Sequence, residues 1–311
     1  MAKKRKGDPI SGWINLDKPY GMTSTQAIGK VRRALNAQKI GHAGTLDPLA
    51  TGVLPIALGE ATKTINFAQE DIKTYRFTIT WGEQRDTDDM EGKVINTSDD
   101  RPTKEQITTL LQKYTGNIEQ TPPIYSAIKI NGKRAYDLAR DGKNPEMKPR
   151  EVYIENIKLL DTQTNEADFE MTCGKGTYVR SIARDMGNDL ECKGYISSLR
   201  RTKVGAFTSK DAISLDILTE LDYVSARSEY LLPLQIVLDD IPALNLTQKE
   251  AANIRNGQAL ELISKPGFER LTNIGLGKKT SISALATHDN APVALIENLR
   301  ATIKPVRVFN M

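Results

Sequence analysis

The stretch GHAGTLDPLATGVLPIALGEATK, residues 41–63, joins a loop of small residues to an apolar run. The run VLPIAL, residues 53–58, is typical of a buried strand. Asp47 is the only acidic residue of the loop at 41–52, and His42 is one of two histidines in the chain. A carboxylate in this position can be a general base, a nucleophile or an electrostatic stabiliser. An aspartate in a loop rich in Gly and Pro is also a common turn residue, so the residue types alone leave its role open.

Three common kinds of site leave signatures that this sequence lacks. Cleavage of a glycosidic bond by opposed carboxylates requires a second acid, but the other candidate acids gather on a single turn, at Asp86, Asp88, Asp89 and Glu91. A phosphate-binding loop ends in Lys followed by Ser or Thr, and GHAGTLDPLATG has no such ending. The two cysteines and two histidines are too widely scattered to indicate a zinc site, so no metal is expected.

The composition is that of an ordinary soluble globular protein. The chain has 311 residues, of which 39% are hydrophobic and 26% charged, and a formal net charge of +4. No run approaches the roughly 18 apolar residues of a membrane-spanning helix. Two cysteines in unrelated settings favour a reducing, cytoplasmic compartment. The basic tail at 1–9 is expected to be a solvated terminus.

Local basic clusters say more than the net charge does. They lie at 32–39, 131–143 and 197–203, and the second contains an aromatic residue, Tyr136. Such clusters are compatible with a surface that follows RNA phosphates, although each one alone is usually a solvated face.

Strand and helix signals are mixed along the chain without a regular strand–helix–strand repeat, which predicts an α+β fold rather than a doubly wound sheet. The clearest helix follows Thr103, which with Gln106 predicts a capping box and a helix that stops at Gly116. In the clearest strand, TYRFTITW at 74–81, alternate residues share one face: Tyr75, Phe77, Ile79 and Trp81.

The pattern changes near residue 236. Thr247 and Glu250 predict a further capping box. Short strands are expected at 269–276, 281–288, 291–298 and 302–310. Residues 236–311 are therefore predicted to form a separate, strand-rich domain.

GHAGTLDPLATGVLPIALGEATK closely resembles the catalytic motif of the TruB family, the bacterial tRNA pseudouridine-55 synthases. Further segments resemble that family in the same order: NLDKPYGMTS, TYRFTITWG, QTPPIYSAIKINGKRAYDLAR and GKGTYVRSIARDMG. The resemblance covers residues 10–210. It implies a pseudouridine synthase fold with a mixed, largely antiparallel sheet over residues 10–235. It also implies an isomerase without metal or organic cofactor that flips out the uridine at position 55 in the T-loop of tRNA and converts it to pseudouridine.

The resemblance further implies roles for individual residues. Asp47 is implied to attack or deprotonate the ribose while the glycosidic bond breaks, and Arg180 to keep that carboxylate charged and oriented. Tyr75 is implied to stack on the target base, and His42 to fill the place that the base leaves. Asp89 is implied to be a second acidic partner of Arg180.

Other parts of the resemblance concern support and RNA binding. Tyr178 and Leu199 are implied to line the uracil pocket, and Lys18 to support the catalytic loop. An insertion at 122–150 resembles an RNA clamp that orders on binding, and 236–311 resembles a PUA-like domain that holds tRNA near its acceptor end. The implied partner is tRNA, contacted at the T-arm and elbow by a monomer that needs no protein partner and no membrane.

Two other interpretations stay open at this point. The chain could be a non-catalytic protein that binds or folds tRNA on the same scaffold, or a synthase that acts on ribosomal or guide-selected RNA. The presence of Asp47, Tyr75 and Arg180 together favours an enzyme, because binding alone does not require an ionised, buried acid.

Overall fold

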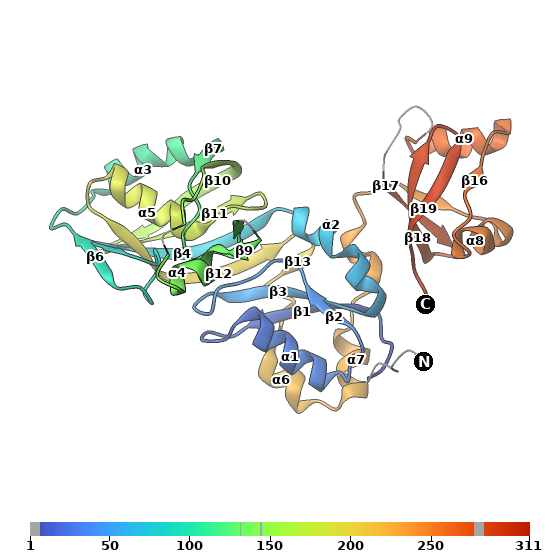
Figure 1. The fold of residues 1–311 in the computed structure, drawn as a ribbon, viewed down its shortest axis with the longest axis horizontal. Coiled ribbons are helices and arrows are strands. Elements are labelled where there is room, and N and C mark those ends of the chain that lie inside the picture. The colour runs from blue at the N-terminus through green and yellow to red at the C-terminus, as the bar shows by residue number, and fades with distance from the viewer. Residues whose placement is uncertain (1–6, 131, 144, 277–282) are drawn as a thin grey trace.

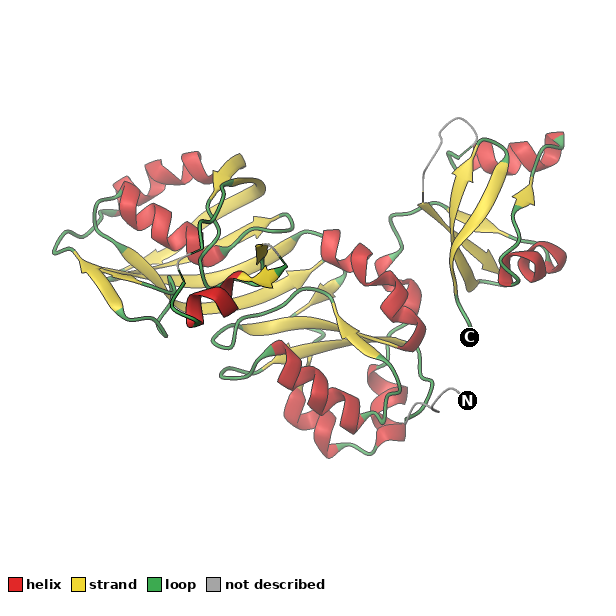
Figure 2. Cartoon of the chain, in the orientation of Figure 1, coloured by secondary structure: helices red, strands yellow, loops and turns green. Residues whose placement is uncertain are grey.

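The computed structural model describes residues 7–130, 132–143, 145–276 and 283–311. Its dominant feature is a mixed sheet that runs β14-β1-β3-β12-β4-β11-β10-β7, with β2 paired to β3 and β13 to β12 (Figures 1 and 2). Two pairs, β1–β14 and β3–β12, are parallel and the others are antiparallel, as the resemblance predicts. The strands are β1 (Gly12–Lys18), β2 (Ile40–His42), β3 (Thr51–Leu58), β4 (Lys73–Trp81), β7 (Gly116–Gln120), β10 (Arg150–Thr162), β11 (Glu166–Cys173), β12 (Gly194–Val204), β13 (Phe207–Thr208) and β14 (Ile213–Ser214).

The predicted strand at 53–58 is confirmed as part of β3, which is buried on both faces. Leu54 packs with α1 (Ser24–Ala34) and α6 (Leu215–Glu220), which cover one face of the sheet in Figure 1. Val53 packs on the opposite side in a cluster with Trp13. Because both faces are covered, the strand reads as a continuous apolar run rather than an alternating one.

The alternation at 74–81 is also confirmed. In β4, Phe77, Ile79 and Trp81 are buried in a core cluster together with side chains of α5 (Val179–Asp189). Phe77 stacks on Phe169 of the neighbouring strand β11, with ring centroids 5.4 Å apart. This packing fixes α5 against the sheet.

The capping box at Thr103 and Gln106 is confirmed at the start of α3 (Lys104–Leu110). The predicted length was wrong: the helix passes into a 3-10 turn, η2 (Leu111–Tyr114), before Gly116 begins β7. Short helices complete this part of the chain: η1 (Gly59–Thr64), α2 (Ile65–Glu70), α7 (Tyr223–Tyr230) and η3 (Leu234–Val237).

Two small hairpins stand apart from the large sheet. One pairs β5 (Glu83–Arg85) with β6 (Val94–Thr97). The other pairs β8 (Lys129–Ile130) with β9 (Lys133–Arg134) and leads into α4 (Ala135–Arg140). The second hairpin and α4 lie within the segment that resembles an RNA clamp.

The C-terminal part of the chain forms its own curled sheet, in the order β15-β17-β18-β19-β16 (Figure 1). Its elements are β15 (Ala243–Asn245), α8 (Gln248–Arg255), β16 (Leu260–Glu261), α9 (Lys265–Asn273), β17 (Ser283–His288), β18 (Ala291–Leu299) and β19 (Thr302–Val308). The small β-rich C-terminal domain of the predicted fold class is therefore present. The exact domain boundaries stay predictions.

Within this domain the capping box at Thr247 and Glu250 is confirmed. The strand expected at 269–276 was wrong, because these residues fall largely in α9, which Ser264 caps and Pro266 opens. Of the strand expected at 281–288, residues 281 and 282 lie outside the described residues. No helix in the described parts of the chain is long and apolar enough to cross a membrane.

Candidate active site

The loop that carries Asp47 connects β2 to β3 and is held on both sides of the carboxylate. The Leu46 amide donates a hydrogen bond to Ser24 Oγ, which in turn donates to the Leu46 carbonyl, both at 2.9 Å. On the other side, the Gly21 amide donates to the Pro48 carbonyl at 2.9 Å. The Asp47 side chain remains 39% exposed. The loop is thus fixed while its acid stays accessible to a ligand.

Arg180 lies in the first turn of α5 and points its guanidinium at this acid. Its Nε is 2.9 Å from Asp47 Oδ2, and the arginine side chain is only 5% exposed. Nη1 donates to the Thr87 carbonyl at 2.9 Å and Nη2 to the Tyr125 carbonyl at 3.0 Å. The structure therefore brings Asp47 and Arg180 together and ties both to two further loops.

Asp89 is the second acid near this guanidinium. Its Oδ2 is 3.7 Å from Arg180 Nε, while Oδ1 accepts hydrogen bonds from Thr87 Oγ1 and the Glu91 amide. Burial raises the pKa of Asp89, and these hydrogen bonds together with the charge of Arg180 oppose that shift. Asp89 is therefore a second carboxyl group beside the guanidinium that pairs with Asp47.

The neighbouring acid, Asp88, has a different partner. Its Oδ2 lies 3.0 Å from Nη1 of Arg184, one helical turn after Arg180. Burial raises the pKa of Asp88 to about 6 in spite of that arginine. Of the acids on this turn, Asp89 is the one that faces Arg180 within ion-pair distance.

A narrow pocket opens beside the Asp47–Arg180 pair. Its lining comes from the Asp47 loop, α5, the loop at 89 and β12: Asp47, Leu49, Ala50, Asp89, Arg180, Ile196, Ser197 and Leu199. The volume open to water is about 10 Å³, which is room for about one molecule. A nucleotide can therefore enter only if the lining side chains move apart.

Tyr75 lies on β4 and is partly buried. Like Leu199, it packs against both core clusters of the large sheet. Burial raises the pKa of its hydroxyl, and the positive charge of Arg201 opposes the shift. The hydroxyl is consequently neutral near pH 7, and the ring does not itself line the closed pocket.

Comparison with known proteins places this site in a family. Residues 32–179 match the family described as TruB family pseudouridylate synthase (N terminal domain), and residues 180–239 match the family described as tRNA pseudouridylate synthase B C-terminal domain. The chain belongs to the TruB family of pseudouridylate synthases. It is 49% identical to the tRNA pseudouridine synthase B of Caulobacter sp. (strain K31) and 46% identical to that of Rhodospirillum rubrum, in both cases over 100% of each chain.

Solved structures show the same fold at lower sequence identity. The structure described as an H/ACA RNP bound to a substrate RNA containing 2′-deoxyuridine has a chain with a TM-score of 0.72 and 21% identity, over 100% of this chain and 92% of that one. A Cbf5-Nop10-Gar1 complex has a chain with a TM-score of 0.69 and 23% identity, over 96% and 84%. The TruB family chain thus has the pseudouridine synthase fold.

Lys18 of this TruB family chain is hydrogen-bonded to the Asp47 loop. Its side chain is fully buried, and Nζ donates to the carbonyls of Pro19, Met22 and Pro48 at 2.8, 2.6 and 3.3 Å. Burial lowers the pKa of Lys18 to about 8, with the charge of Asp47 opposing and that of Arg201 adding to the shift.

His42 and Tyr178 do not line the pocket. His42 pairs with Ile56 at the end of β2, and its buried Nδ1 has no hydrogen-bond partner among the described residues. Burial lowers the pKa of His42. Tyr178 immediately precedes α5, and the Arg150 guanidinium lies over its ring at 5.1 Å. Both residues flank the site rather than meet Asp47.

Sequence reasoning missed Arg201, whose side chain holds the backbone at both ends of the Asp47 loop. Its guanidinium is buried, and Nε donates to the Val53 carbonyl at 2.8 Å and Nη2 to the Gly44 carbonyl at 3.1 Å. These two carbonyls lie at the two ends of the Asp47 loop. The sequence signal is weak: Arg201 shares strand parity with Leu199, but it lies in a basic cluster that reads as a solvated face.

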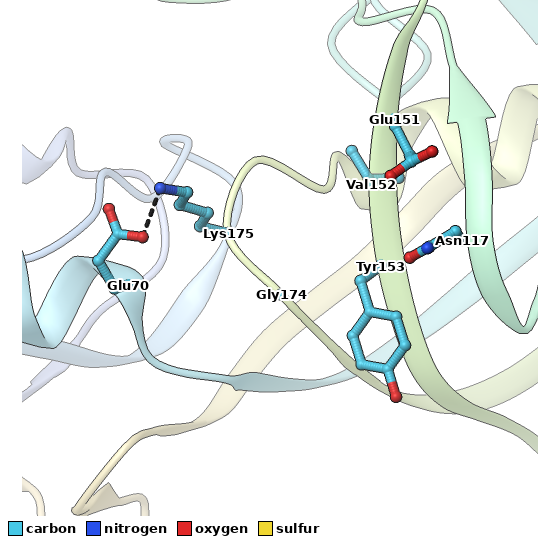
Figure 3. Close-up of a pocket in the computed structure, with 7 residues that line it drawn as sticks. All are labelled: Glu70, Asn117, Glu151, Val152, Tyr153, Gly174 and Lys175. Carbon is cyan, nitrogen blue, oxygen red and sulfur yellow. Dashed lines mark ion pairs between the residues drawn. The ribbon is translucent and has the colours of Figure 1, made fainter. Parts of the chain in front are cut away.

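A second pocket is wide and lies elsewhere, where β7 and β10 meet the turn before α5. Figure 3 shows its lining, which includes Glu70, Glu151, Tyr153 and Lys175, with Lys175 and Glu70 forming an ion pair. It contains none of the predicted site residues. The described residues also contain no group of three or more His, Cys, Asp or Glu side chains that could hold a metal ion.

Proposed function

We propose that this chain converts the uridine at position 55 in the T-loop of tRNA to pseudouridine, with the carboxylate of Asp47 as the catalytic group. The observation that carries the proposal is the pairing of an accessible Asp47 carboxylate with the buried Arg180 guanidinium at 2.9 Å. The names of the relatives, tRNA pseudouridine synthase B, support tRNA as the substrate.

The reaction requires a carboxylate that meets the ribose of an extruded nucleotide. Asp47 would act there as a nucleophile at the anomeric carbon or as a base on the sugar, and both courses need the same placement. Arg180 fixes the orientation of Asp47 and offsets the charge of the two acids beside it. The released uracil anion can then turn within the opened pocket and bond through carbon 5 to the anomeric carbon, as the sugar breaks its bond to Asp47 or takes its proton back from Asp47. Loss of the proton on carbon 5 and uptake of a proton at N1 then complete the isomerisation.

The base would occupy the pocket after it opens. Leu199 lines that pocket and shares its core contacts with Tyr75, so a base that displaces Leu199 approaches the Tyr75 ring. His42 would take the place of the extruded base, and Tyr178, which precedes α5, would line the uracil pocket once it opens. Lys18 would keep the loop in position without reacting, since its ammonium is occupied by three carbonyls.

RNA contacts beyond the pocket are assigned to two regions. The segment at 122–150 would clamp the T-arm: Arg134 and Arg140 lie over the Tyr136 ring at 5.7 and 5.5 Å, and such an arrangement suits stacking and phosphate binding. The C-terminal domain would hold tRNA near its acceptor end. The chain would act as a monomer and would need no protein partner.

The decisive experiment compares wild type with Asp47→Asn on an unmodified tRNA transcript, with pseudouridine mapped by carbodiimide-stop sequencing. We expect the variant to lose at least about 100-fold in rate, the lower range for a missing catalytic base. Its Kd for tRNA should stay within about threefold, since the change removes one charge of many at the interface.

Asp99→Asn is the matched control, because Asp99 is exposed and its side chain has no partner in the described chain. It should retain full activity. Equal rates in wild type and Asp47→Asn would refute the catalytic role. A wild type that binds tRNA but forms no pseudouridine would support the non-catalytic alternative, and modification of a different RNA would support the other.

A further inference from the structure

The segment from the end of β1 to the start of α1, residues 18–24, is hydrogen-bonded to the loop that carries Asp47. Besides the Gly21 amide, Lys18 Nζ donates to the Pro48 carbonyl at 3.3 Å, and Ser24 Oγ makes two hydrogen bonds to the Leu46 backbone. These contacts reach the residues on either side of Asp47. In Figure 1 the β1–α1 loop and the β2–β3 loop project from the same end of their strands. The segment is therefore fixed relative to the catalytic carboxylate.

Tyr20 lies at the tip of this segment. Its side chain is 59% exposed, and no other large hydrophobic side chain in residues 7–89 is as exposed. Within the described chain its ring has no stacking or cation contact and its hydroxyl no hydrogen bond. The backbone around it is constrained by Pro19 on one side and by the hydrogen bond of the Gly21 amide to the Pro48 carbonyl on the other.

A single exposed aromatic residue is common on protein surfaces, but this one combines two unusual properties. The backbone segment that carries Tyr20 is held by hydrogen bonds. The next residue, Gly21, is hydrogen-bonded to Pro48, which follows Asp47 directly. An exposed aromatic ring on a fixed backbone near a proposed nucleotide-binding pocket is a preformed stacking surface, because every nucleobase presents a flat face. A ring needed only for packing would be covered by its own chain.

We propose that Tyr20 stacks on a nucleobase that flanks the extruded uridine in the RNA hairpin. This inference rests on the proposed function of the Asp47 site and adds a substrate-binding residue to it. Tyr20 would touch a base that does not react, so its contact is the same in the bound substrate and in the transition state. Its loss should therefore raise KM and leave kcat unchanged.

The test uses synthetic T-arm hairpins, each with one abasic site at a nucleotide next to the target uridine. On the intact hairpin, Tyr20→Ala should raise KM by about 5- to 100-fold, with kcat within about twofold. Tyr20→Phe keeps the ring and should behave as wild type. Tyr223→Ala removes another exposed tyrosine, on α7, and should change neither constant.

The abasic hairpins identify the contact. One abasic position should raise the KM of wild type and remove the difference between wild type and Tyr20→Ala, because both then lack the same stack. Unchanged KM in Tyr20→Ala, or a difference that persists on every abasic hairpin, would overturn the inference. A wild type that is active on the intact hairpin keeps the proposed function in either case, whereas an inactive wild type removes both.

Discussion

At the scale of single residues, the Lys18 ammonium connects the position of the Asp47 loop to pH. An ammonium has three N–H donors and a neutral amine has two, and Lys18 uses three donors to hold the carbonyls of Pro19, Met22 and Pro48. Its pKa is lowered from 10.5 to about 8, chiefly by burial. A lowered pKa means that the proton is lost at a lower pH than in water, so one carbonyl loses its donor above pH 8.

We therefore expect kcat to fall as pH rises through about 8, by about fivefold, the effect of about one hydrogen bond on the position of the loop. Single-turnover rates on a tRNA transcript between pH 6 and 9.5 would measure this. Lys18→Met should be slower than wild type at every pH and lack the decline near pH 8. A wild-type profile that stays level to pH 9 would contradict the assignment.

The residue scale also shows what a sequence can and cannot disclose. Asp47 and Arg180 were paired in advance because both lie in recognisable motifs, and their side chains meet in the structure. The carbonyls of Thr87 and Tyr125, which hold Arg180, could not be predicted, since any residue type supplies a carbonyl. The burial of Arg201 could not be predicted for another reason. Its guanidinium donates hydrogen bonds to backbone carbonyls, so the sequence contains no acidic partner that would point to a buried arginine.

At the scale of elements, Gly52 determines how closely β3 and β12 approach. It has φ +99°, and a Cβ at this position would lie 2.2 Å from the Arg201 carbonyl oxygen. The parallel pairing of these strands is confined to Arg200–Thr51 and Arg201–Gly52. The short contact thus places Leu199 and Arg201 beside the catalytic loop.

We expect Gly52→Ala to lower the free energy of unfolding by about 3 kcal/mol or more, because it adds backbone strain and a clash with backbone. Gly116→Ala is the control, since Gly116 has φ +88° but nothing within 4 Å of the added Cβ, and it should cost about 1 kcal/mol. Urea unfolding followed by circular dichroism would compare them. Equal losses would show that strain alone, and not the approach of β12, decides the effect at Gly52.

Elements with local signals were predictable and their arrangement was not. The alternation at 74–81 and the capping boxes at Thr103 and Thr247 indicate their elements directly. The order β1-β3-β12-β4 joins strands far apart in the chain, and no local pattern encodes it. The C-terminal helix α9 was mistaken for a strand because Ile274 and Leu276, beyond its end, lie two residues apart and suggest alternation.

At the scale of the whole molecule, the last residues of the chain fasten the C-terminal sheet to the catalytic part. Phe309 is 3% exposed in a cluster that also contains Leu234 and Leu285. Beside it, Lys63 Nζ donates to the Val308 carbonyl at 2.6 Å, and the Asn310 amide donates to a Glu60 carboxylate oxygen at 2.8 Å. One aromatic anchor and two polar contacts therefore tie the end of β19 to η1.

If the C-terminal domain holds tRNA away from the T-arm, this anchor sets the distance between two binding surfaces. Phe309→Ala should then raise KM for full-length tRNA by about tenfold, since a loosened second module lowers its effective concentration. KM for a T-arm hairpin, which engages only the catalytic part, should stay unchanged, as should kcat on both RNAs. Met311→Ala is the control, because Met311 is 67% exposed beside the same anchor. An equal rise in KM on both RNAs would mean that Phe309 acts on the catalytic part itself. No rise in KM on either RNA would mean that the position of the C-terminal domain has no influence on substrate binding.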